Sequence, residues 1–122
     1  MSIAVKRVHD QPSEEDGYRV LVDRLWPRGV SRVMASLDLW LRDIAPSTAL
    51  RTWYAHQPER WPAFRERYRA ELAEHGPLLD VLTDVEQHRG RVTLLFAARD
   101  RERNEAQVLA DVLRQRPSHS HR

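Results

Sequence analysis

Seven charged, aromatic or amide side chains near two short segments could do chemistry. They are Asp23, Arg24, Trp26 and Arg28 in the first segment, and Arg99, Asp100 and Asn104 in the second. Arginine guanidinium groups present paired donors that match the oxygens of a phosphate or carboxylate. Aspartate carboxylates can act as general bases, bind a metal or a ribose hydroxyl, or hold an arginine in place. We therefore interpret the three arginines as anion ligands and the two aspartates as candidate catalytic residues.

The stretch from Arg19 to Arg32 carries a local excess of positive charge, because it holds four arginines and a single acid, Asp23. Trp26 lies in the same stretch and is a candidate to stack on a base. Ser47 and Asn104 are expected at helix N-termini, where backbone N–H groups attract anions, and we include both among the binding candidates. The alternative is that the arginines and aspartates pair with one another at the surface.

Both clusters follow runs that are typical of buried strands. Tyr18–Asp23 centres on Val-Leu-Val, and Val92–Ala97 is the clearest strand of the chain. Ligands of open parallel sheets bind beyond the carboxyl ends of the strands. We predict that the two strands are parallel neighbours, so that the residues after them share one rim and their guanidinium groups face a common hollow.

The rest of the chain alternates strands with helices. A further strand is expected at Ile3–Val8, whereas Leu37–Ile44 fits either a strand or one helical face, and we favour the strand. Capping and stop signals predict helices over residues 31–36, 47–55, 59–75, 77–88 and 103–114. The predicted buried face of the helix over 77–88 consists of Leu78, Val81, Leu82 and Val85.

This order of elements predicts a three-layer α/β single domain with a small, mostly parallel sheet flanked by helices. The chain of 122 residues is long enough to bury a core without disulfides or a metal. We expect the domain to span residues 1–115 and residues 116–122 to form a flexible C-terminal tail.

The composition and the motifs exclude several classes of protein. The chain has no cysteine, which removes disulfides, thiolate nucleophiles and cysteine-bound zinc. It has no P-loop, no glycine-rich dinucleotide motif and no G-x-S-x-G elbow, so we name no cofactor. His119 and His121 of the tail could bind a metal but offer only two close ligands, and the other four histidines lack metal-ligand spacing, so no metal site is expected. Neither a signal peptide nor a membrane span is evident, and the cytoplasm is the expected location.

Several longer motifs resemble a known family. The stretch Asp16–Gly29, followed by Trp40–Ser47, resembles the YeaO-like branch of the domain of unknown function 488 family. Phe64–Tyr68 with Glu71-Leu72, and Thr93–Asp100 with Asn104, match it too. The resemblance spans nearly the whole chain except the tail, and it implies a compact α/β domain with the motif residues at strand ends.

The resemblance implies no particular activity, and one position departs from the family's pattern. Short members of the family often carry a histidine beside the asparagine that corresponds to Asn104, and longer members carry a Cys-His-Arg element after the last strand. Here Glu105 follows Asn104. A mechanism that depends on a histidine base or a thiolate at this place is therefore not supported for this chain.

Three functions compete on these observations. The leading hypothesis is a small enzyme or a ligand-binding domain for an anionic, phosphorylated or nucleoside-like small molecule. The second is a nucleic-acid-binding module that uses the same arginines, with Trp26 stacked on a base; the net charge of +2 does not favour it. The third is a homodimeric interaction protein, whose contact would be an exposed aromatic surface between Trp53 and Tyr68.

Overall fold

A computed structural model describes residues 2–116 of the chain. Of the predicted tail, residues 117–122 lie outside the described residues, and so do both tail histidines. Among the described residues, the strands are β1 (Ser2–Arg7), β2 (Tyr18–Leu21), β3 (Leu39–Trp40) and β4 (Arg91–Phe96). They form one sheet in the order β1-β4-β2-β3, and every neighbouring pair is parallel. The parallel sheet of a single α/β domain is confirmed.

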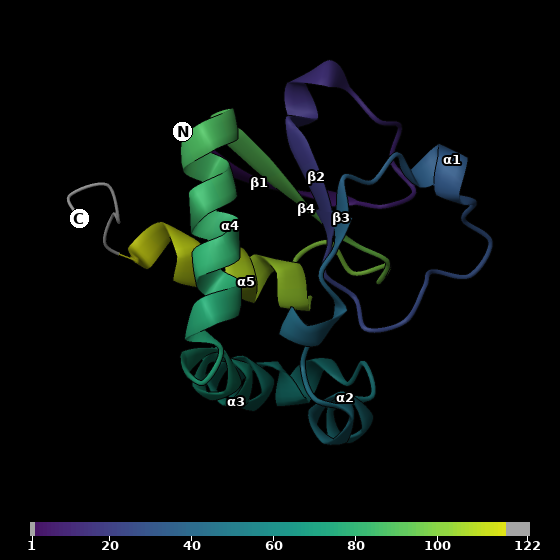
Figure 1. Cartoon of the computed structure of the whole chain (residues 1–122). Coiled ribbons are helices and arrows are strands. Elements are labelled where there is room, and N and C mark those ends of the chain that lie inside the picture. The colour runs from purple at the N-terminus through teal and green to yellow at the C-terminus, as the bar shows by residue number, and fades with distance from the viewer. Residues whose placement is uncertain (1, 117–122) are drawn as a thin grey trace.

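Helices and loops cover the two faces of the sheet unequally. The helices are α1 (Arg32–Ala35), α2 (Thr48–Tyr54), α3 (Trp61–Ala73), α4 (Gly76–Arg89) and α5 (Glu105–Gln115). The four longer helices share one large core cluster with side chains such as Val20, Val22 and Leu94. A smaller cluster, which includes Leu21 and Leu95, packs under α1 on the opposite face. Figure 1 shows α4 and α5 on one side of the sheet and α1 on the other.

The alternation of side chains along each strand explains the two clusters. Successive residues of a strand point to opposite faces, so Val20 and Val22 enter the large cluster while Leu21 enters the small one. In α5, Val108, Leu109 and Leu113 are buried as the spacing predicts. Asn104 is the N-cap of this helix, because its side chain accepts a hydrogen bond from the backbone N–H of Gln107.

One arginine of the charged stretch belongs to the scaffold. Arg19 is only 4% exposed, and its guanidinium group pairs with Asp16 and donates to the carbonyl of Ala35. Lys6 also contacts the carboxylate of Asp16. The charge of Arg19 is therefore used inside the fold, and it does not add to the positive charge of the rim.

The segment predicted as a strand over residues 37–44 is a two-residue strand followed by a turn. β3 ends at Trp40, and Arg42–Ile44 forms a 3-10 turn. The backbone of Leu41 leaves the extended region, with φ −101° and ψ 69°, and this ends the pairing with β2. The alternating strand pattern thus describes Leu39 and Trp40 only, and the segment from Arg42 to Ile44 turns as a 3-10 helix.

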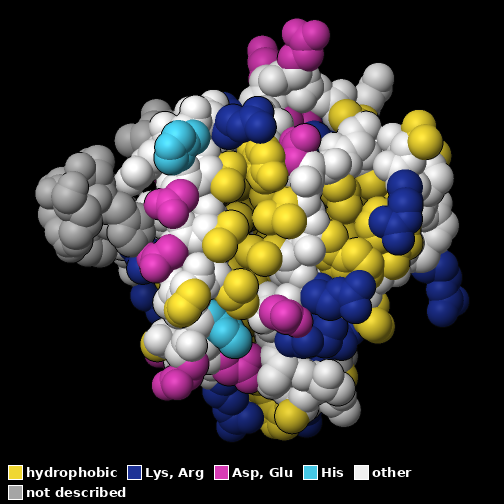
Figure 2. Space-filling model, in the orientation of Figure 1, with side chains coloured by type: hydrophobic (Ala, Val, Ile, Leu, Met, Phe, Trp, Pro, Cys, Tyr) yellow, Lys and Arg dark blue, Asp and Glu magenta, His cyan; other side chains and the backbone are white. Residues whose placement is uncertain are grey.

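Figure 2 shows hydrophobic side chains across the middle of this face of the molecule, between α4 and α1.

The buried face of α4 also differs from the prediction. Leu79 is 5% exposed, whereas Val81, which we predicted inside, is 40% exposed. Leu82 is fully buried, and Leu78 and Val85 are partly buried. The prediction was wrong for Val81 because the helix is rotated so that Leu79 and Leu82, three residues apart, face the sheet. Within residues 2–116, no helix is long and apolar enough to cross a membrane.

Candidate functional site

The ends of β2 and β4 meet, as predicted. The two strands are parallel neighbours, with Leu21 paired with Leu95. The chain then leaves them in opposite directions: after β2 it covers the small cluster through Trp26 and Ala35, and after β4 it leads to α5 on the large cluster. Such a divergence leaves a crevice at the carboxyl ends of the strands, where open α/β sheets bind ligands.

A pocket of about 360 Å³ occupies this crevice. Its lining comes from the loop after β2, from the end of β4 with the start of α5, and from α2 and α3, which lie beyond the strand ends in Figure 1. The volume falls within the range of small-molecule sites. The predicted rim is therefore hollowed, and two helices that we did not associate with it close its far side.

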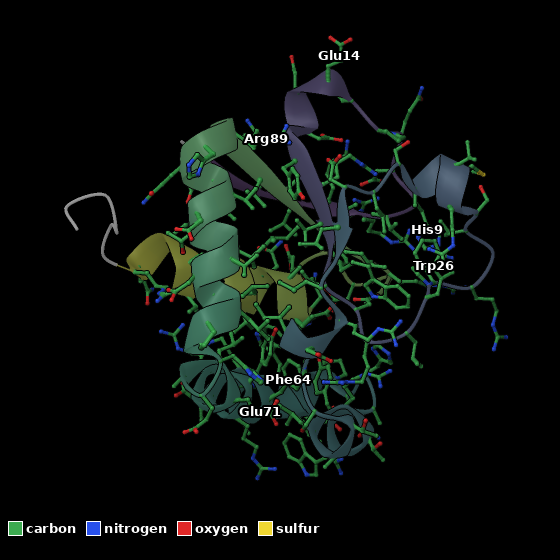
Figure 3. The ribbon with its side chains drawn as sticks, viewed as in Figure 1. His9, Glu14, Trp26, Phe64, Glu71 and Arg89 are labelled. Atoms are coloured by element: carbon green, nitrogen blue, oxygen red, sulfur yellow. The ribbon has the colours of Figure 1, made fainter. Side chains whose placement is uncertain are left out.

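One wall of the pocket is aromatic and apolar. Tyr54 of α2 and Phe64 of α3 lie with their ring centroids 4.5 Å apart, and Pro27 and Ala97 also line the pocket. Figure 3 shows Phe64 on α3 and Trp26 on the loop that leads to α1. His56 stands beside Tyr54 and has a left-handed backbone with φ 57°. A non-glycine residue in that region is uncommon and is found more often at functional sites.

Three arginines line the same pocket. Arg24 donates from Nη2 to the carbonyl of Ala45 over 3.2 Å and from Nε to that of Pro46 over 3.4 Å. These two bonds hold the guanidinium group in place and leave donors free. Arg51 of α2 is exposed and pairs with no acid among the described residues. Arg103 is held by an ion pair with Asp100, 2.9 Å from Nε to Oδ2.

A pair of carboxyl groups lies on the same pocket lining. Asp23 at the end of β2 is hydrogen-bonded to Glu105, the first residue of α5, and its Oδ2 accepts from the backbone N–H of Ala97 over 3.0 Å. Burial, and next the adjacent charge of Asp23, raise the pKa of Glu105 well above its usual value. Sequence reasoning did not identify Glu105 as a site residue; the signal that could have found it is its place directly after the N-cap Asn104.

The other predicted site residues have separate structural contacts. Asp100 accepts from the backbone N–H groups of Glu102 and Arg103 and from Arg103 Nε. The backbone hydrogen bond from Arg103, together with its side chain, lowers the pKa of Asp100 to about 2. Asp100 therefore caps a turn instead of facing the pocket as a free base. Arg28 and Arg99 are exposed and are not among the residues that line the pocket.

Ser47 and Trp26 have most of their polar atoms engaged. The N–H and the hydroxyl of Ser47 both donate to the carboxylate of Glu71, 2.8 and 2.6 Å away, and Ser47 is not among the residues that line the pocket. Trp26 lines the pocket, but its Nε1 donates to the carbonyl of Val30 over 2.6 Å and its ring packs edge-on against Trp40. Asn104 lines the pocket too, with its amide donating to the carbonyl of Asp100.

The segment proposed for a homodimer contact does not expose its aromatic rings as expected. Phe64 is 3% exposed and Tyr68 is fully buried. Trp53 is partly buried, with the guanidinium carbons of Arg60 and Arg67 5.2 and 4.1 Å from its ring centroid. The prediction of an exposed aromatic surface was therefore wrong, because these rings join the core or lie under arginines. Among residues 2–116, no group of acids and histidines could hold a metal ion.

Comparison with known proteins gives one family and several relatives. A family model described as "Inactive DUF488-N3 subclade" matches residues 2–121. The chain is 45% identical over 114 residues to the uncharacterized protein YeaO of Escherichia coli (strain K12). The aligned region covers 93% of this chain and 98% of the relative. It is 41% identical over 113 residues to the uncharacterized protein Rv3073c of Mycobacterium tuberculosis (strain H37Rv), covering 91% and 92%. No solved structure matches the chain.

Proposed function

The chain belongs to the YeaO-like branch of the domain of unknown function 488 family, and from this premise we propose that it is a non-catalytic binding domain for a phosphorylated small molecule. The proposed site is the pocket at the carboxyl ends of β2 and β4. The observation that carries the proposal is the presence of Arg24 and Arg51 on the lining of this pocket, neither of them paired with an acid among the described residues.

The balance of charge in the pocket favours an anion. Asp100 neutralises Arg103, and the raised pKa of Glu105 favours its uncharged form. The guanidinium groups of Arg24 and Arg51 remain on the lining without an ion pair to an acid among the described residues. The N-terminus of α5 adds backbone N–H groups at the same place, which attract negative charge. A phosphate fits this arrangement because its oxygens match the forks of the arginines.

The chemistry of the acids supports binding without turnover. The word "inactive" in the description of the matching subclade agrees with this proposal. Asp100 is engaged by two backbone N–H groups and Arg103, which leaves it a weak base. Asp23 and Glu105 contact one another directly, whereas the two carboxyl groups of a glycosidase stand about 5 Å or more apart to flank the bond that breaks. No pair of acids on the lining is thus spaced for that reaction.

Calorimetric titration with inorganic phosphate and AMP tests the proposal. At low salt and pH 6.5, both should bind the wild type, and Arg24→Ala and Arg51→Ala should each weaken binding by about tenfold, the effect of losing about one charge-assisted hydrogen bond. Arg28→Ala is the matched control, because Arg28 is exposed and outside the pocket lining. Equal weakening by all three variants, or no binding at all, would count against the pocket.

The nucleic-acid alternative makes the opposite prediction for the same variants. Affinity for a single-stranded oligonucleotide would then fall steeply with salt and would depend on exposed cations such as Arg28 and Arg99. A pocket ligand depends on Arg24 and Arg51 instead. Titrating the three variants with an oligonucleotide at two salt concentrations separates the two functions.

A further inference from the structure

The carboxyl groups of Asp23 and Glu105 line the pocket but do not take part in the proposed binding of phosphate. The two side chains come from segments 82 residues apart in the sequence, the end of β2 and the first residue of α5, and both line the pocket. Their carboxyl groups are hydrogen-bonded to each other. Two ionised carboxylates cannot form such a bond because both are only acceptors, so one of them carries a proton.

The surrounding donors place that proton on Glu105. Oδ2 of Asp23 accepts the backbone N–H of Ala97 over 3.0 Å, so this oxygen acts as an acceptor. Oε2 of Glu105 is buried, and no N–H or O–H group of another described residue donates to it. The acid that carries the proton is therefore Glu105, at the start of α5, and it donates that proton to Asp23. The other oxygens of the pair on the pocket lining can accept hydrogen bonds from a ligand.

A ligand hydroxyl suits this pair better than a second anionic group does. A hydroxyl group can donate to a carboxyl oxygen, and two adjacent hydroxyls can donate to both carboxyl groups. An anionic group in the same place has no proton to donate to these acceptors. The arginines therefore suit a phosphate and the carboxyl pair suits hydroxyl groups, and both sets of residues line the same pocket.

We propose that the pocket selects a ribose phosphate, with Arg24 and Arg51 on the phosphate and the Asp23–Glu105 carboxyl pair on the vicinal hydroxyls of the sugar. This inference rests on the proposed function and adds the class of ligand. The aromatic wall of Tyr54 and Phe64 provides the flat apolar surface against which a base attached to that sugar packs. A nucleoside monophosphate combines all three features.

Four probes test the inference by calorimetric titration of the full chain: AMP, 2′-deoxy-AMP, adenosine and inorganic phosphate. We expect AMP to bind the wild type about tenfold more tightly than 2′-deoxy-AMP, because the deoxy compound leaves a polar group of the carboxyl pair unpaired. Equal affinities for the two nucleotides, with inorganic phosphate still bound, overturn the hydroxyl recognition and leave the phosphate site intact. Binding of adenosine as tight as that of AMP overturns the phosphate site and leaves the hydroxyl recognition; no binding of any probe overturns both.

Two variants of Glu105 link the selectivity to the carboxyl pair. Glu105→Gln keeps the shape, a donor towards Asp23 and a carbonyl acceptor, so the preference for AMP over 2′-deoxy-AMP should remain. Glu105→Ala removes the pair, so AMP and 2′-deoxy-AMP should then bind with about equal affinity, while inorganic phosphate still binds. Circular dichroism and the phosphate titration establish that each variant is folded. A preference unchanged in Glu105→Ala contradicts the assignment.

Discussion

The carboxylate of Asp23 accepts a hydrogen bond from the backbone N–H of Ala97 over 3.0 Å, and this contact joins the ends of β2 and β4 at the base of the pocket. The same carboxylate is bonded to the acid of Glu105, so a single side chain links two strands and the start of α5. The site and the scaffold therefore meet at Asp23, and changes there affect both.

Replacing Asp23 with alanine should destabilise the fold. The change leaves the N–H of Ala97 and the acid of Glu105 without their partner in a poorly solvated place, which lowers the free energy of unfolding by about 1–3 kcal/mol. Asp23→Asn keeps an oxygen acceptor of the same shape and should retain most of the stability. Urea unfolding at pH 6 measures both variants. Equal losses in the two would contradict the role of the acceptor.

Glu105 should make the protein less stable as the pH rises. Its pKa in the folded protein lies well above its usual value of about 4.5, so the folded state holds a proton that the unfolded chain releases. The stabilisation is complete below that usual value and is lost as the pH rises through the raised pKa. The charged groups that act on Glu105 are Asp23, which raises the pKa, and Arg51, which lowers it.

Glu105→Gln should remove this dependence because a carboxamide does not titrate. Urea unfolding of the wild type from pH 5 to pH 9 should show a decline in the free energy of unfolding that the variant lacks. Glu66→Gln is the control, since Glu66 is exposed on α3 and should leave the decline unchanged. Parallel curves for the wild type and Glu105→Gln would show that Glu105 is ionised in the folded protein.

The buried hydroxyl of Tyr68 should matter for stability. It donates to the carbonyl of Ile44 over 2.7 Å inside the large core cluster. Tyr68→Phe leaves that carbonyl without its partner and should lower the free energy of unfolding by about 1–3 kcal/mol. Tyr18→Phe is the control, because Tyr18 is partly exposed and should change stability by less than about 0.5 kcal/mol. Thermal and urea unfolding of both variants measure the two changes in the free energy of unfolding.

Gly17 should tolerate no side chain. Its backbone has φ +66°, and a Cβ atom there would stand 2.5 Å from the carbonyl oxygen of Arg91. Gly29 also has a positive φ, +77°, but a Cβ atom there meets nothing within 4 Å. Both alanine variants carry the strain of a positive φ, and only Gly17→Ala adds a backbone clash. A smaller loss of stability in Gly17→Ala than in Gly29→Ala would contradict this geometry.

The strands and most helices could be predicted because their signals are local. The Val-Leu-Val run of β2, the N-caps Ser47 and Asn104, and the stop at Gly90 are each fixed by neighbouring residues. The exposure of Val81 could not be read in this way. It depends on how α4 is rotated against the sheet, which is a property of tertiary packing.

The location of the site could be predicted from the sequence, but several of the residues that form it could not. The rule for parallel sheets located the rim after β2 and β4, and it brought Asp23, Arg24 and Asn104 to the pocket. Arg51 and Glu105 were missed because nothing in their own sequence context distinguishes an arginine or glutamate that faces a cavity from one that faces water. Asp100 was valued as an acid, although its place four residues before Asn104 suits a turn that leads into a helix.

The central claim, that the pocket between the ends of β2 and β4 is where a phosphorylated ligand binds, is tested most directly by titrating the ¹⁵N-labelled chain with AMP and recording backbone amide spectra. We expect the largest shifts at the N–H groups of Asp23, Ala97 and Glu105, with the amides of Gly29 and Arg99 changing little. Shifts confined to the exposed loops around Arg28 and Arg99, or none at millimolar AMP, would contradict the account.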